Sequence, residues 1–361
     1  MTESDRQMAP ATSPDLGILQ PTFEAIRTNC HISDARHAGD YTLCVYLLKM
    51  REYYRWENNL PFSMPLPQQD LSDWLTQREA HWETLEDKPM ETVPVPGSRH
   101  DPFDTPAINA SLNDHGFAYS SGYGRNMKPV FFFAALERRE QHDGYTLIVT
   151  GREYARDLAA PPAMSREHTI YIRRESLRRM LWEKIEEWRW NKPANAMRNA
   201  IRCYDFDNAA ERSLEAMTDT ELHSALLHEI GEVEAGKLLG GEWEAMLAAL
   251  PPGKAEIMLR AVRDNLADCL VTLPALLERA EPAALHFYVG NMSNMRKTLF
   301  PALVSAYDAW TASGSTTELQ AVTSRAAKHW KSLALGLLDS YSRDQPDCPQ
   351  TLIGNIENNT Y

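Results

Sequence analysis

The spacing of apolar residues changes twice along the chain, and this change limits the possible folds more than any other sequence feature. In the first and last parts apolar residues recur every three to four positions, as in Leu43, Leu47, Met50 and Tyr54. That period is typical of amphipathic helices. Between residues 117 and 172 they form short runs of strand length instead. We therefore expect an α+β protein, mostly α, in which a helical domain carries a small antiparallel β insertion in the middle of the chain.

Prolines, glycines and polar stretches divide the chain further. The expected segments are a disordered tail (1–20), an N-terminal helical segment (21–92), a β-rich insertion (93–174), a C-terminal helical domain (175–342) and a polar tail (343–361). Strands are expected over 117–120, 129–136, 145–150 and 169–172, and the turn signal at 141–144 predicts a hairpin between the second and third of them.

Helix starts are marked by residues that cap free backbone N–H groups. Ser33 is a suitable N-cap for a helix expected over 34–57. Thr218 and Glu221 have the spacing of a capping box and predict a helix over 218–239. A further helix is expected over 254–280, and the proline at position 274 should kink it or end it early.

The net charge is −13, from 37 Lys plus Arg and 50 Asp plus Glu. Such a surface repels phosphates, which argues against nonspecific nucleic-acid binding. The charge is uneven, because residues 125–202 contain 16 basic and 10 acidic residues, a balance of +6 that leaves −19 for the rest. This basic region predicts a small anionic ligand or an acidic protein partner, or equally contact with the protein's own acidic helices.

No secretory signal precedes the helical part, and no run of 18 apolar residues predicts a membrane span. The five cysteines are widely spaced and form no Cys-x-x-Cys pair, which argues against a disulfide framework. We therefore expect a cytoplasmic protein with reduced thiols and no membrane partner.

The first candidate for chemistry is Cys30, which precedes the helix expected from residue 34 and neighbours His31. A helix N-terminus favours the thiolate over the thiol, so Cys30 is a candidate nucleophile. The competing interpretation is a buried, inert thiol beside surface histidines.

The residues around Cys30 also carry a resemblance. Residues 29–35 (NCHISDA) and 39–57 (GDYTLCVYLLKMREYYRWE) resemble the opening of an uncharacterised bacterial protein family. The resemblance implies a bacterial origin and no particular activity.

The second candidate lies on two helices. His228 and Glu232 are four residues apart, as are Asp264 and Asp268 on the next long helix, so each pair projects from one side of its helix. Histidine and carboxylates on facing helices can bind a divalent metal, so these four residues are candidate metal ligands. His228 and Glu232 are also candidates for catalytic proton transfer.

A helical wheel favours a different interpretation of the same residues. Leu222, Leu226, Ile230 and Val233 cluster roughly opposite His228 and Glu232, which predicts that the polar pair faces solvent. Small residues flank both polar stripes and would let another element approach closely. They are Ala225, Ala235 and Gly236 on one helix, and Ala261 and Ala275 on the other.

The third candidate is the glycine-containing loop before the second strand, where Arg125 and Lys128 could bind an anionic substrate. Two functions follow from these candidates. One is an enzyme acting on a small anionic substrate, with a metal or acid/base site on its helices. The alternative is a non-catalytic protein that binds an acidic partner through its basic region and oligomerises through its helices.

Overall fold

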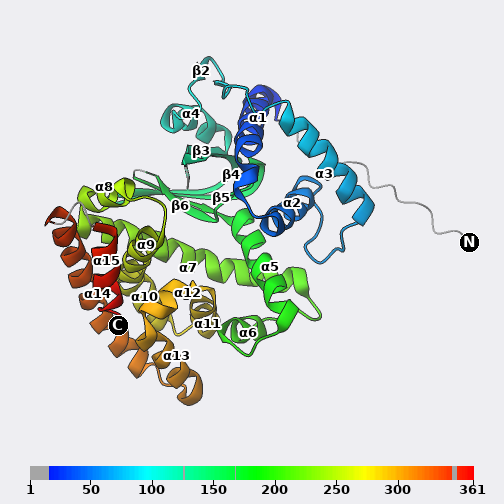
Figure 1. Cartoon of the computed structure of the whole chain (residues 1–361). Coiled ribbons are helices and arrows are strands. Elements are labelled where there is room, and N and C mark those ends of the chain that lie inside the picture. Colours follow the sequence, from blue (N-terminus) through cyan, green and yellow to red (C-terminus); the bar gives the residue numbers. More distant parts are fainter. Residues whose placement is uncertain (1–15, 125–126, 167, 344–347) are drawn as a thin grey trace, which may run out of the picture. The chain divides into compact units, whose positions relative to one another are not determined.

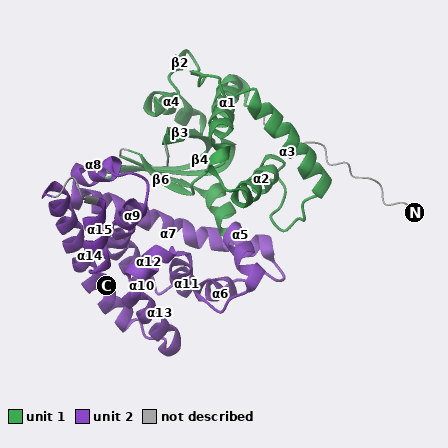
Figure 2. Ribbon diagram, viewed as in Figure 1, with its two compact units in different colours: residues 1–182 green, residues 183–361 purple. Residues whose placement is uncertain are grey.

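The computed structural model describes residues 16–124, 127–166, 168–343 and 348–361. The chain divides into two compact units, residues 1–182 and 183–361, and helix α5 (Arg174–Asn191) contains the boundary (Figures 1 and 2). Helices predominate, as the apolar period predicts. No helix in the described residues is long and apolar enough to cross a membrane.

The helices of unit 1 begin earlier than expected. Helix α1 (Gln20–His37) is followed by the 3-10 turn η2 (Ala38–Asp40) and helix α2 (Leu43–Glu57). The single helix predicted over 34–57 is therefore wrong, and Ser33 lies inside α1 instead of capping a helix. The physical reason is that α1 has its own start at residues 20–22, where Pro21 occupies a first-turn position that needs no N–H donor. Unit 1 also contains helices α3 (Gln68–Glu83) and α4 (Thr105–Leu112).

The sheet is larger than the small insertion that the sequence predicts. Its five strands run in the order β3-β4-β5-β7-β6, and a separate antiparallel pair is formed by β1 (Val93–Val95) and β2 (Ser98–His100). The hairpin is confirmed, since His142 pairs with Tyr145. The antiparallel prediction is incomplete, because β5 and β7 are parallel. The bounds are β3 (Phe117–Tyr123), β4 (Pro129–His142), β5 (Tyr145–Arg156), β6 (Ala163–Arg166) and β7 (Thr169–Arg173).

Strand β4 explains why the central apolar run is continuous instead of alternating. Phe131 and Phe133 belong to the hydrophobic cluster that contains Phe23 and Ile26 of α1. Phe132, which points to the other face, packs in a second cluster around Tyr171 and Ile148. Both faces of β4 are therefore buried, and every position in the run must be apolar.

In the residues that the structure describes, unit 2 contains helices and no strands. Helix α9 (Lys254–Ala267) is central and contacts α7, α12, α14 and α15. Its buried residues include Met258, Val262 and Leu266. The other helices are α6 (Ala196–Arg202), α7 (Ala210–Leu239), α8 (Gly241–Ala249), α10 (Leu273–Arg279), α11 (Pro282–Asn291), α12 (Asn294–Leu299), α13 (Pro301–Ser313), α14 (Thr317–Arg343) and α15 (Cys348–Glu357) (Figure 1).

Two further expectations for this unit are corrected. The expected polar tail 343–361 contains α15, because Leu352 and Ile356, four residues apart, are completely buried in the core. The capping box is also wrong. Helix α7 begins at Ala210, which places Thr218 and Glu221 inside it, where both are buried.

Candidate functional site

Close packing of α7 against α9 creates the main polar cluster of unit 2. A Cβ atom added to Gly231 would lie 2.5 Å from the carbonyl oxygen of Ala267, so only glycine permits this approach. His228 and Glu232 lie within one turn of Gly231, and Asp264 and Asp268 lie within one turn of Ala267. The contact between two backbones therefore brings together four polar side chains, two from α7, one from α9 and one from the residue that follows α9.

The geometry of the cluster centres on His228. Its Nδ1 atom lies 2.8 Å from Oδ1 of Asp268, and its Nε2 atom lies 3.6 Å from Oε1 of Glu232. One ligand atom each of His228, Glu232 and Asp264 lies within 4.8 Å of the others. These three side chains form a set of one nitrogen and two carboxylates that could hold a metal ion.

Asp268 is fixed from several sides and is only 1% exposed. Thr272 donates a hydrogen bond to its Oδ1 atom at 2.7 Å, and Tyr288 donates to Oδ2 at 3.0 Å. Arg296 forms an ion pair with the same carboxylate. Asp268 is thus held by α11 and α12 as well as by His228, which suits a residue that orients the imidazole ring.

The backbone at Asp268 is irregular. Residues Asp268–Thr272 form the π-helical turn η5, and α10 follows directly. The predicted disturbance at Pro274 is confirmed, because proline has no N–H group to continue the α-helical hydrogen bonds. Such π-helical turns are frequent at functional sites.

Charges shift the pKa values of this cluster in opposite directions. Burial alone would lower the pKa of His228, but Asp268 and Glu232 outweigh burial and raise it well above its usual value. Burial would raise the pKa of Glu232, but the hydrogen bond with His228 and the charge of Arg263 lower it to about 2. Burial dominates at Asp264 and raises its pKa, although Arg296 and His228 oppose the shift.

Asp264 differs from its neighbours, because its carboxylate makes no hydrogen bond or ion pair within the described residues. Arg263 beside it pairs with Glu232 at 3.0 Å and with Glu244 at 2.8 Å. The side chains of His228 and Glu232 are 32% and 23% exposed, so the cluster is open on one side.

The helical wheel misplaces the buried face of α7. The buried residues that follow each other at four-residue steps are Leu227, Gly231, Ala235 and Leu239. Ile230 and Leu226, which the wheel favours, are only half-buried. Close approach of α9 buries the stripe that contains the small residues. His228 and Glu232 lie beside this stripe and are therefore partly buried as well.

Cys30 lies in unit 1, in the interior of α1, and is completely buried. Its thiol donates a hydrogen bond to the carbonyl of Phe131, and burial together with Asp157 and Asp34 raises its pKa well above the usual value. The helix N-terminus that would favour its thiolate is ten residues away, at Gln20. These surroundings correspond to the inert thiol of the competing interpretation.

The two residues expected to bind an anion are not available together. Lys128 is buried and forms an ion pair of 2.9 Å with Asp34, which is completely buried. Arg125 lies outside the described residues. Asp34 also accepts the backbone N–H of Leu158, so it ties α1 to the chain that follows β5.

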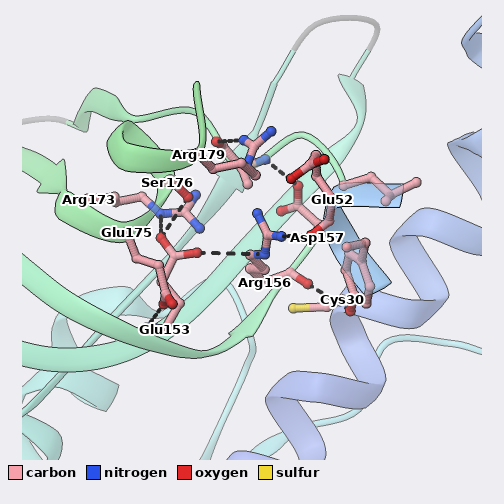
Figure 3. Close-up of polar contacts among 12 residues, drawn as sticks. Cys30, Glu52, Glu153, Arg156, Asp157, Arg173, Glu175, Ser176 and Arg179 are labelled. Atoms are coloured by element: carbon pink, nitrogen blue, oxygen red, sulfur yellow. Dashed lines mark hydrogen bonds and ion pairs between the residues drawn. The ribbon is translucent and has the colours of Figure 1, made fainter. Parts of the chain in front are cut away.

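A second buried cluster of charges lies where β5 and β7 meet the start of α5 (Figure 3). Glu153 pairs with Arg173 at 2.8 Å and with Arg156 at 3.9 Å, and Ser176 donates a hydrogen bond to it. The neighbouring carboxylate of Glu175 accepts the backbone N–H of Glu153. Burial, with the charge of Glu153, raises the pKa of Glu175 to about 7. Part of the basic region is thus neutralised by the protein's own carboxylates.

Residues of the unit 2 cluster that sequence reasoning missed are Arg263, Thr272, Tyr288 and Arg296. Thr272 could have been found, because it follows Asp268 by one helical turn. Tyr288 and Arg296 are on other helices, and no spacing in the sequence relates them to His228.

The comparisons with known proteins give a family but no activity. Residues 22–173 match a model described as the N-terminal domain of a family of unknown function (DUF6866), and residues 178–359 match the C-terminal domain of the same family. The chain therefore belongs to this family, and the match extends far beyond the N-terminal resemblance. No curated protein and no solved structure matches the chain.

Proposed function

We propose that this member of an uncharacterised family is an enzyme that uses a divalent cation held by His228, Glu232 and Asp264. The observation that carries the proposal is the meeting of one imidazole and two carboxylates within 4.8 Å, on two helices that only a glycine allows so close together. Asp268 is assigned a positioning role instead of the ligand role expected from its spacing.

The orientation of His228 supports this division of roles. Histidine ligands of metals commonly donate their other ring N–H to a carboxylate, which fixes the tautomer and the ring plane. Asp268 stands in that position, 2.8 Å from Nδ1. Nε2, on the Glu232 side, is then the atom directed at a cation.

Charge balance supports a cation as well. The raised pKa of His228 makes its imidazole a cation when no metal is bound, and a metal ligand must lose that proton. With the imidazole neutral, the carboxylates of Glu232, Glu244, Asp264 and Asp268 are balanced, among the described residues, by the guanidinium groups of Arg263 and Arg296. The resulting excess of two negative charges equals the charge of one divalent cation. The donor set of one nitrogen and two oxygens suits Zn²⁺, Mn²⁺ or Fe²⁺.

The proposed reaction is a metal-assisted transformation of a small anionic substrate. Three protein ligands leave coordination positions for water and substrate, and a bound cation acts as a Lewis acid and makes water more acidic. Arg263, whose side chain is 16% exposed, lies beside Glu232 and is proposed to orient the anionic group.

Metal analysis of the purified chain tests the proposal. Protein exchanged into Zn²⁺ or Mn²⁺ and then dialysed should retain about one ion per chain. Asp264→Asn should lower the affinity by at least about 10-fold and still fold, because Asp264 has no hydrogen-bond partner to lose within the described residues.

Glu234→Gln is the matched control, since Glu234 lies on α7 near Glu232, its side chain is 46% exposed, and among the described residues it forms an ion pair with Lys237 alone. It should bind metal as the parent does. Equal affinity in Asp264→Asn and the parent, or no retained metal in the parent, would sink the proposal.

The alternative function, binding of an acidic partner through the basic region, receives no such support. Lys128, Arg156 and Arg173 of that region are buried and paired with Asp34 and Glu153.

A further inference from the structure

Unit 1 contains a pocket that takes no part in the proposed metal site. It has a volume of about 450 Å³ and lies between the end of α1, the turn η2, the start of α2 and the end of α3. The small residues Ala35, Ala38 and Gly39 line one wall and leave the space open. The chemically distinctive lining residues are Tyr41, Tyr46, Trp82, Glu79, Glu83 and Glu86.

The carboxylates come from one stretch of chain. Glu79 and Glu83 are four residues apart on α3, and Glu86 follows in the turn after the helix, so all three reach the same pocket. Tyr46 donates a hydrogen bond to Glu79 at 2.9 Å. The carboxylates of Glu83 and Glu86 make no hydrogen bond or ion pair within the described part of the chain.

The aromatic residues add a second, independent preference for positive charge. The faces of tyrosine and tryptophan rings attract cations, and this attraction adds to that of nearby carboxylates. The ring of Tyr41 already attracts cations of the protein itself, since the ammonium groups of Lys49 and Lys128 lie 5.2 and 5.5 Å from its centroid. Lys128 pairs with Asp34 and Lys49 donates to the carbonyl of Leu158, and neither belongs to the lining.

The lining contains three acidic residues and no lysine or arginine among the residues described. Arg36, which lies close to Glu86 in the fold, donates to the backbone carbonyls of Glu86 and Lys88 and is outside the lining. Leu43, also in the lining, is 71% exposed and offers apolar surface to the body of a ligand. Glu79, Glu83 and Glu86 are exposed, so water solvates their carboxylates while the pocket is empty. Their negative charge repels an anion and attracts a cation.

We propose that this pocket binds an organic ammonium ion carried on an apolar body. The charged nitrogen lies among Glu79, Glu83 and the rings of Tyr46 and Trp82, and the apolar body lies against Tyr41 and Leu43. The volume of about 450 Å³ lies within the range of small-molecule sites.

Calorimetric titration of the full chain with three probes of nearly equal shape tests this assignment. The probes are 2-phenylethylamine, which is cationic, 2-phenylethanol, which is neutral, and phenylacetate, which is anionic. The amine should bind at least 10-fold more tightly than the alcohol, and phenylacetate should not bind. Equal binding of amine and alcohol, or no binding of the amine up to 10 mM, overturns the proposal.

Variants then place the binding in this pocket. Glu83→Gln should weaken amine binding 3- to 10-fold, and Glu83→Gln combined with Glu86→Gln should weaken it further. Asp73→Asn is the matched control, because Asp73 is exposed on the same helix and is absent from the lining. Equal loss in Asp73→Asn and Glu83→Gln would mean general attraction to an acidic protein and would also overturn the assignment.

Discussion

Each unit of this protein buries a cluster of charges, but the two clusters differ in exposure to solvent and in whether each charge has an ion-pair partner. In unit 1, Glu153 forms ion pairs with Arg156 and Arg173, although one polar atom of each of these three side chains makes no hydrogen bond. In unit 1, Glu153 is 2% exposed and lies among Arg156, Arg173 and Ser176, themselves no more than 3% exposed. In unit 2, the side chains of His228 and Glu232 are 32% and 23% exposed, and Asp264 has no hydrogen-bond partner within the described residues.

The difference separates a structural role from a binding role. Removing charges from water is costly, and a closed cluster offsets that cost only when each charge has a partner inside the protein. A cluster that is open on one side and has an unsatisfied carboxylate has room for a further charged group. We therefore assign stability to the unit 1 cluster and cation binding to the unit 2 cluster.

The substitution with the largest expected effect on stability removes the central carboxylate of the closed cluster. Glu153→Ala leaves Arg156 and Arg173 buried without their carboxylate, and we expect a loss of about 3–5 kcal/mol in the free energy of unfolding. Urea unfolding of both proteins measures it. Glu140→Gln is the control, since Glu140 lies on the same sheet with exposed partners and should change stability by less than about 0.5 kcal/mol. Similar losses in the two variants would contradict a special role for burial.

A substitution with an intermediate expected effect tests the close contact between α7 and α9 at the open cluster. Gly231→Ala places a Cβ atom against the backbone of Ala267, so α7 must move, and we expect a loss of about 1–3 kcal/mol together with weaker metal binding. Gly236→Ala on the same helix meets nothing within 4 Å and should stabilise the protein by about 0.5–1 kcal/mol. The test is urea unfolding of both variants beside metal retention. Two stabilised variants would mean that α7 and α9 do not need the glycine.

The smallest expected effect is a pH dependence of the closed cluster. The pKa of Glu175 is raised from its usual 4.5 to about 7, so its protonated form is favoured in the folded state. Its contribution to stability is complete below about pH 4.5 and is lost as the pH rises through 7.

Glu175→Gln imitates the protonated form and keeps an acceptor for the N–H of Glu153. We expect the free energy of unfolding of this variant, relative to that of the parent, to rise by on the order of 1–2 kcal/mol between about pH 5 and pH 8. Unfolding curves measured at several pH values give the difference. Stability curves that run parallel over this range would show that Glu175 titrates normally in the folded protein.

Local patterns predicted several parts of the structure correctly. The hairpin from His142 to Tyr145 follows from a turn signal between apolar runs, and the irregularity near Pro274 follows from its missing N–H group. The i and i+4 spacing also identified His228 with Glu232 and Asp264 with Asp268, pairs that the fold brings together.

Predictions that needed the identity of a neighbouring element were wrong or incomplete. The parallel pairing of β5 with β7 cannot be read from either strand, since the apolar residues that pair, Leu147 to Val149 with Ile170 to Ile172, suit either direction. The helical wheel assumed that large apolar residues mark the buried face of α7. In fact Gly231 marks it, because α9 approaches closely where there is no side chain. Cys30 was expected near a helix start, and only the full extent of α1 shows that it lies inside.

The sequence by itself determined the helical character of the chain, the hairpin, and which side chains project together from a single helix. These properties depend on residues a few positions apart, and local backbone geometry relates them directly. The tertiary structure decided which helices meet and which charges are buried in pairs. It also decided which carboxylate has no hydrogen-bond partner among the described residues. Those outcomes depend on packing between residues that are far apart in the sequence, such as Asp34 and Lys128 or His228 and Asp268. The second contact exists because Gly231 lets α7 approach the chain at Ala267 closely.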